Sequence, residues 1–158
     1  MNEITSTGSK AIQAAAHHEN VARLRSYLDQ LPQSDYGIRD IFLPGIYMRE
    51  MTIPAGSILV GAVHKTKHAV IVSGGRIAVD SGAGVVEMAA PLTFASEAGA
   101  ERVGIAMEDT VFTTVHPNPT NSTDVAWLTE QLTHSKLEEL VGGSKNVQLQ
   151  NQRNRELE

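Results

Sequence analysis

The chain has 158 residues, a formal net charge of −5 and no cysteine; 41% of its residues are hydrophobic and 20% are charged. This size and composition are typical of one globular domain with appended segments. The negative charge argues against a nucleic-acid backbone as partner, and the lack of cysteine excludes disulfides and thiolate metal sites. The sequence has no apolar run of the ~20 residues that a membrane helix needs, and its N-terminus lacks the pattern of a signal peptide. We therefore expect a cytoplasmic protein whose partners are neither membranes nor nucleic acids.

Residues 1–37 are predicted to form a polar arm followed by a helix. Ser9 is a suitable N-cap for a helix over 9–31, and Pro32 ends it. Apolar residues recur at helical spacing within it, namely Val21, Leu24, Leu28 and Leu31. Because this apolar stripe is narrow, we expect the helix to lie against a surface or a partner chain.

Residues 38–118 change to the alternating pattern of β-strands. About eight short strands are predicted, separated by tight turns. They cover residues 45–53, 57–64, 68–73, 76–80, 85–88, 92–95, 102–107 and 111–116. Many short strands with a turn every 8–12 residues are typical of an antiparallel sandwich or barrel.

The strand at 45–53 carries apolar side chains on both faces. Tyr47, Met51 and Ile53 lie on one face, and Ile46 and Met48 lie on the other. A strand that is apolar on both sides normally has a cover on its outer face. Either the protein's own helices or a second subunit could provide it. We expect a homo-oligomer, with Tyr47 as one candidate contact.

Residues 119–143 return to helical spacing. Val125, Leu128 and Leu132 share one face of a first helix, and residues 136–141 form a second, short one. The last segment, 144–158, is almost entirely polar, so it is predicted to be disordered or ordered only by a partner.

Histidines are the main candidates for chemistry. His64 and His68 would lie ~13 Å apart on one continuous strand, but a corner at Lys65-Thr66-Lys67 would let the two imidazoles converge. His116 is the only other histidine in the strand region. Three histidines could hold zinc, iron, nickel or manganese; alternatively, they are ordinary polar residues at a barrel mouth. The remaining histidines, His17, His18 and His134, are predicted to lie on the surface.

The stretch GAVHKTKHAVIVSGG, from Gly61 to Gly75, resembles the first signature of the cupin family, G-x5-H-x-H-x3-4-E-x6-G. His64 takes the second histidine position and His68 the glutamate position, whereas Ala62 replaces the first histidine. In the second signature, Arg102 replaces the ligand histidine. The resemblance implies a mainly β, cupin-like double-stranded β-helix (a jelly-roll barrel) over residues 38–118, flanked by an N-terminal helix and C-terminal helices. Within such a barrel, alternation along the strands places His64 and His68 at one mouth.

Two longer runs are similar to small single-domain cupin-like proteins of tailed bacteriophages. They are MREMTIPAGSILVGAVHKTKHAVIVSGGRIAV and APLTFASEAGAERVGIAMEDTVFTTVHPNPTNSTDVAWLTEQL. The resemblance implies five candidate site residues: His64, His68, Arg102, Glu108 and His116. An inward Arg102 would attract a small anionic ligand, and Lys65 could assist it. Glu108 is either a general acid or ligand, or part of an ordinary acidic turn.

Two functions remain open at this stage. The first is a non-catalytic phage protein that assembles into the virion or binds a small ligand, because Ala62 and Arg102 replace two usual cupin ligands. The alternative is a metal-dependent cupin enzyme that uses His64, His68 and His116, with an open metal position for water or dioxygen. The first reading adds virion proteins as partners and places the chain in the host cytoplasm or the virion.

Overall fold

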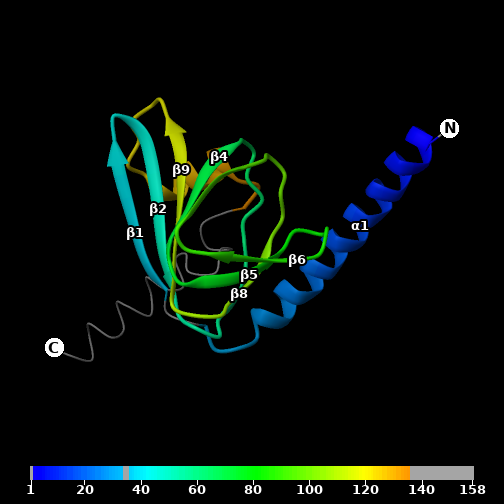
Figure 1. Cartoon of the computed structure of the whole chain (residues 1–158). Coiled ribbons are helices and arrows are strands. Elements are labelled where there is room, and N and C mark those ends of the chain that lie inside the picture. The colour runs from blue at the N-terminus through cyan, green and yellow to red at the C-terminus, as the bar shows by residue number, and fades with distance from the viewer. Residues whose placement is uncertain (1, 34–35, 136–158) are drawn as a thin grey trace.

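The computed structural model describes residues 2–33 and 36–135, which form two helices and two antiparallel sheets (Figure 1). In chain order the elements are α1 (Asn2–Leu28), β1 (Gly37–Leu43), β2 (Gly45–Ile53), β3 (Ile58–Val60), β4 (His68–Gly74), β5 (Arg76–Asp80), β6 (Val85–Ala89), β7 (Leu92–Ser96), β8 (Val103–Ala106), β9 (Thr110–Asn118) and α2 (Val125–Leu132). The predicted helix at 136–141 and the polar tail at 144–158 lie outside the described residues. Neither described helix combines the length and apolar character needed to span a membrane.

The strand order is that of a jelly roll. One sheet has the order β1-β2-β9-β4-β7 and the other has the order β3-β8-β5-β6. With β1 set aside, each sheet has four strands, and the chain crosses between the sheets in the double Greek-key pattern of jelly rolls and cupins. The prediction of a mainly β, cupin-like barrel with helices at both ends is therefore confirmed.

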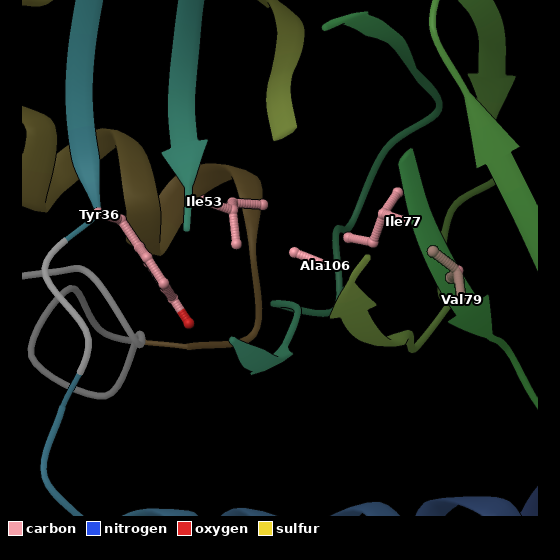
Figure 2. Close-up of a cluster of buried hydrophobic side chains, with 5 residues drawn as sticks. All are labelled: Tyr36, Ile53, Ile77, Val79 and Ala106. Carbon is pink, nitrogen blue, oxygen red and sulfur yellow. The ribbon is translucent and has the colours of Figure 1, made fainter. Parts of the chain in front are cut away.

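The closed end of the barrel is filled by aliphatic side chains from both sheets. Ile53 of β2 faces Ile77 and Val79 of β5, and Ala106 of β8 lies between them (Figure 2). Tyr36 closes this cluster just before β1, and its hydroxyl donates a hydrogen bond to the carbonyl of Ile58 at 3.3 Å. This packing leaves the opposite end of the barrel for the polar residues described below.

The main differences between the predicted and the observed elements concern β1, β3 and α1. The strand β1 was not predicted, although Gly37–Leu43 pairs with β2 along its whole length. The turn between them depends on Gly45, whose φ of +74° favours glycine. The strand predicted at 57–64 is shorter in the structure, where β3 ends at Val60. The helix α1 begins at Asn2 rather than at Ser9.

The face of β2 that carries Tyr47 and Ile53 points into the barrel. Tyr47 is only 3% exposed, and it packs against Leu128 and Leu132 of α2. The prediction that Tyr47 contacts a second subunit is therefore wrong, because the chain's own C-terminal helix covers this residue.

The C-terminal half of α1 lies against the barrel, and its N-terminal part extends away from it (Figure 1). Val21 is buried, and Arg25 donates to the carbonyl of Gly61 at 3.4 Å. The expectation that His17 is a surface residue is wrong: it is half-buried, its Nε2 lies 3.0 Å from the carbonyl oxygen of Glu101, and its ring packs against Gly82. The contacts of His17 come from the carbonyl of Glu101 and from Gly82, which lie far away in the sequence. The helical pattern of α1 therefore could not predict them.

Candidate functional site

Three histidines from separate segments meet at the open end of the barrel. After β3 the chain leaves its sheet, and His64 forms an isolated antiparallel bridge with Thr133, just beyond α2. The exposed residues 65–67 then form the predicted corner, and His68 begins β4. The ring centroids of His64 and His68 are 4.1 Å apart, and the ring of His116, from β9, lies 4.9 and 4.7 Å from them.

The histidine cluster (His64, His68 and His116) is electrically neutral near pH 7. Burial, with a smaller effect of the neighbouring His68, lowers the pKa of His64 to about 4. Burial also lowers the pKa of His116 to about 3, with further contributions from the other two histidines. The pKa of His68 is lowered as well, first by burial and then by the positive charge of Arg102. A proton on any one ring would be poorly solvated and would repel its neighbours.

The hydrogen bonds of the rings leave nitrogen lone pairs inside the barrel. The Nδ1 atom of His68 lies 3.1 Å from the carbonyl oxygen of Thr66, which can only accept, so Nδ1 carries the proton and Nε2 the lone pair. His64 is anchored in a similar way by the backbone of Ala62. The Nδ1 atom of His116 is buried and has no hydrogen-bond partner among the described residues. A buried nitrogen of this kind is costly unless a ligand satisfies it.

The cluster matches a metal site in its chemistry and only partly in its arrangement. Neutral imidazoles anchored through their second nitrogen are the usual ligands of transition metals. The rings of His64 and His116, however, stack face to face at an interplanar angle of 17°, which does not direct their nitrogen atoms at one common point. Over residues 2–33 and 36–135, no group of three or more histidine, aspartate or glutamate side chains is arranged to hold a metal ion. The side chains would have to rotate before they could share one.

A cavity of ≈ 130 Å³ extends from the histidine cluster into the barrel. Its walls are mostly apolar and come from both sheets and from α2. The apolar lining residues include Met51, Leu59, Val60, Val70, Ile77, Val79, Phe112 and Leu132. This volume is close to that of an apolar protein cavity of 150 Å³ known to bind benzene. The space therefore suits a small molecule with an apolar body.

Arg102 also faces this cavity. One of its terminal nitrogens donates to Ser96 Oγ at 2.7 Å, and its guanidinium carbon lies 5.8 Å from the centre of the Phe94 ring. Both partners belong to β7, whereas Arg102 directly precedes β8, so the side chain crosses from one sheet to the other. Burial lowers the pKa of Arg102, although a guanidinium stays charged at any physiological pH.

A second arginine at the cavity, Arg49, is balanced by a carboxylate. Arg49 donates to Asp40 Oδ1 at 3.1 Å, and the hydroxyl of Tyr47 donates to the same oxygen at 2.7 Å. Burial, and then the bond to Asp40, raise the pKa of Tyr47, so its phenol stays protonated. This network was missed at the sequence level. Strand alternation places Tyr47 and Arg49 on one face, but it does not indicate a pairing with the neighbouring strand.

Two predicted site residues lie elsewhere. Lys65 is exposed, and its Nζ donates to the carbonyl of Glu130 in α2 at 2.6 Å. Glu108 is exposed beside Arg76, 3.7 Å away, and it does not line the cavity. The cavity also includes Thr129 and Thr133 from the C-terminal segment, which no sequence motif indicated. The structure thus brings together four of the six predicted site residues: the histidine cluster and Arg102.

No protein-family model matches the sequence, and no curated protein matches it. Similar solved structures include ectoine synthase from P. lautus, which is 14% identical with a TM-score of 0.48 over 55% of this chain and 67% of that one. A cupin domain from Bordetella pertussis is 16% identical with a TM-score of 0.45, over 56% and 98% of the two chains. A cupin-2 domain protein from Shewanella frigidimarina is 12% identical with a TM-score of 0.45, over 60% and 92%. At these values no activity can be transferred to this chain.

Proposed function

We propose that the protein is a non-catalytic, cupin-like barrel that binds a small molecule with an apolar body in its internal cavity. The single observation that carries this proposal is the mainly apolar cavity of ≈ 130 Å³ next to the histidine cluster. The unpartnered Nδ1 of His116 supports it, because a bound molecule could donate a hydrogen bond to this nitrogen. Binding sites of small molecules typically combine apolar walls with a few such polar groups.

Toluene is a suitable probe because its size is close to that of the cavity. The test measures its binding to the metal-free protein by NMR, through contacts between the probe and methyl groups of the lining residues. Val70→Phe should abolish binding, because Val70 is buried and faces the cavity. Ile71→Phe is the matched control, because the next residue of a strand points to the other face. A wild-type protein that does not bind toluene, or a Val70→Phe variant that still binds it, would overturn the proposal.

A metal-dependent cupin enzyme is the second candidate. The specific observation in its favour is the meeting of three neutral imidazoles, one of them with a free buried nitrogen. His64, His68 and His116 would hold the ion, which would supply a Lewis acid that can activate water or dioxygen. Elemental analysis of untagged protein tests this reading. Stoichiometric metal that is lost in His64→Ala supports it, and metal-free protein with an intact barrel contradicts it.

The biological setting that we propose is a tailed bacteriophage, with the protein in the host cytoplasm or in the virion. The support is the similarity of the two sequence runs to phage cupin-like proteins, together with the exposed N-terminal part of α1, which offers a surface for neighbours. Mass spectrometry of purified virions of a phage that encodes the chain tests the virion role. Absence of the protein from the particles leaves only a role in the infected cell.

We further propose that copies of the protein associate through the outer face of the five-stranded sheet. A row of apolar side chains crosses all five strands on this face: Ile41, Met48, Val115, Ala69 and Ala95. These residues point outward because Tyr47 and His116, their neighbours in the chain, point inward. A continuous apolar row on a sheet surface is typical of a face that is covered in the assembled protein.

A further inference from the structure

We propose that the molecule bound in the barrel is a monocarboxylate, and that Arg102 binds its carboxylate group. This inference rests on the proposed ligand-binding function and names the chemical class of the ligand. The first step concerns charge. Arg102 makes no ion pair with any carboxylate of residues 2–33 and 36–135; its contacts are the hydroxyl of Ser96 and the ring of Phe94. A half-buried guanidinium of this kind lacks the counter-charge that buried cations normally have.

The carboxylates near Arg102 all have contacts with other side chains. Asp40 accepts from Arg49 and Tyr47 on the opposite wall. Glu97, which follows Ser96, forms an ion pair with Lys67 at 2.8 Å. The Glu101 carboxylate lies 2.8 Å from Nδ1 of His18, on the side of the barrel that faces α1. The histidine cluster is neutral, so Arg102 supplies the only uncompensated charge among the described residues that line the cavity.

The guanidinium is also held in position for recognition. The carbonyl of Arg102 accepts from the backbone N–H of Gly61 at 2.8 Å, which fixes the start of β8 against the end of β3. The bond to Ser96, a fully buried residue, fixes the other end of the side chain. A guanidinium has five N–H donors, so several remain for a ligand, and two of them match the two oxygens of a carboxylate.

The size and charge of the cavity favour a carboxylate over a phosphate. A phosphate dianion would bring two negative charges to a wall with one unpaired cation, which would leave one charge buried and unbalanced. A carboxylate brings a single charge, and its apolar body fits the aliphatic and aromatic walls. The volume of ≈ 130 Å³ accommodates a body of about the size of a benzene ring.

Benzoate and its neutral isostere benzamide separate charge recognition from filling of the cavity. We measure the binding of both by titration calorimetry and ligand-observed NMR, using the metal-free wild-type protein near pH 7. Benzoate should bind at least about tenfold more tightly than benzamide. In Arg102→Met the affinity for benzoate should fall at least about tenfold, whereas that for benzamide should stay within about twofold. Arg39→Met changes an exposed arginine on the five-stranded sheet and should leave both affinities unchanged.

The outcomes distinguish the inference from the function on which it rests. Equal binding of benzoate and benzamide to the wild-type protein overturns the carboxylate inference, whereas ligand binding in the barrel stands. Absence of binding by both probes also overturns the carboxylate inference, and absence of toluene binding overturns the proposed function as well. The wild-type comparison needs no variant, so it decides the question even if Arg102→Met does not fold. Arg102→Lys keeps the charge but loses the planar fork, so it should retain part of the preference for benzoate.

Discussion

The neutral histidine cluster should make the protein lose stability as the pH falls from 8 to 5. In the unfolded chain a histidine has a pKa near 6.5 and becomes protonated over this range. In the folded protein the pKa of His64 is about 4 and that of His116 about 3, so both stay neutral at pH 5. The unfolded state then binds more protons than the folded state, and the free energy of unfolding therefore decreases as the pH falls.

The size of this effect follows from the 1.5 pH units between 6.5 and 5. At about 1.4 kcal/mol per unit, each of these two histidines should lower the free energy of unfolding by about 2 kcal/mol. Together they give about 4 kcal/mol, a large part of the ~5–15 kcal/mol that stabilises a typical domain. The lowered pKa of His68 adds to the loss in the same direction. The loss levels off below about pH 3, where the folded protein also takes up these protons.

Urea unfolding at pH 8, 7, 6 and 5, with EDTA to remove metal ions, measures this dependence. Trp127, the only tryptophan, lies on α2 beside the cavity wall and reports unfolding by fluorescence. His116→Asn should remove about 2 kcal/mol of the difference between pH 8 and pH 5. His134→Gln, a change at an exposed histidine, should leave the difference unchanged. A wild-type stability that is constant between pH 8 and 5, or a His116→Asn variant with the wild-type dependence, would refute the reasoning.

Three further changes test the fold, the helical cap and the outer sheet face. Gly75→Ala should destabilise the barrel by several kcal/mol more than Gly56→Ala. Both glycines have a positive φ, where an alanine costs about 1–2 kcal/mol. Only at Gly75 would the added Cβ also collide with the carbonyl of Asp109. Asp124→Ala should destabilise α2 by about 1 kcal/mol and speed its amide hydrogen exchange, because the Asp124 side chain caps the helix by accepting from a backbone N–H. Met48→Lys should shift the light-scattering mass toward 17.0 kDa, the mass of one chain.

Each of these changes has a matched control and an outcome that counts against it. Asp124→Asn should retain the cap, since asparagine is an equally good N-cap; equal amide exchange in the alanine and asparagine variants would contradict the capping role. Thr52→Lys places a charge on the outer face of β2 away from the apolar row, so it should keep the oligomer. A wild-type mass of one chain over a dilution series would end the oligomer proposal. Similar stabilities of the two glycine variants would show that the turn at Gly75 can relax.

The sequence predicted those features that depend on neighbouring residues. The polar corner between His64 and His68 follows from three hydrophilic residues between two apolar runs, and the two rings do meet across it. The barrel follows from period-two segments separated by glycine turns. The first strand was missed because Gly37–Leu43 has the apolar run of a strand but lies directly after an N-terminal segment whose period is helical. Its pairing with β2 over seven residues, a tertiary contact, is what makes it a strand.

The features that the sequence did not predict all require knowledge of which segments come together. Tyr47 was placed on a strand face correctly, but whether a helix or a second subunit covers that face cannot be read from alternation. His17 sits on a helix that is predicted to be exposed, and its burial is explained by its contacts with Gly82 and with the carbonyl oxygen of Glu101, both in distant loops. Lys65 was a candidate because of its charge and Glu108 because of the family resemblance; the structure gives each a partner away from the cavity.

Helix α2, which lines the cavity, and the histidine cluster are held in place by the same backbone hydrogen bonds. The backbone N–H of Lys65 donates to the carbonyl of Leu132, and the backbone N–H of His134 donates to the carbonyl of Val63, both at 2.8–2.9 Å. His64 lies between these two bonds, within its bridge to Thr133. Since α2 ends in this bridge, a displacement of α2 must also displace His64. Access of a ligand to the barrel and the placement of one polar group at its mouth are therefore mechanically coupled, and this coupling exists whether the cluster contacts an organic ligand or a metal ion.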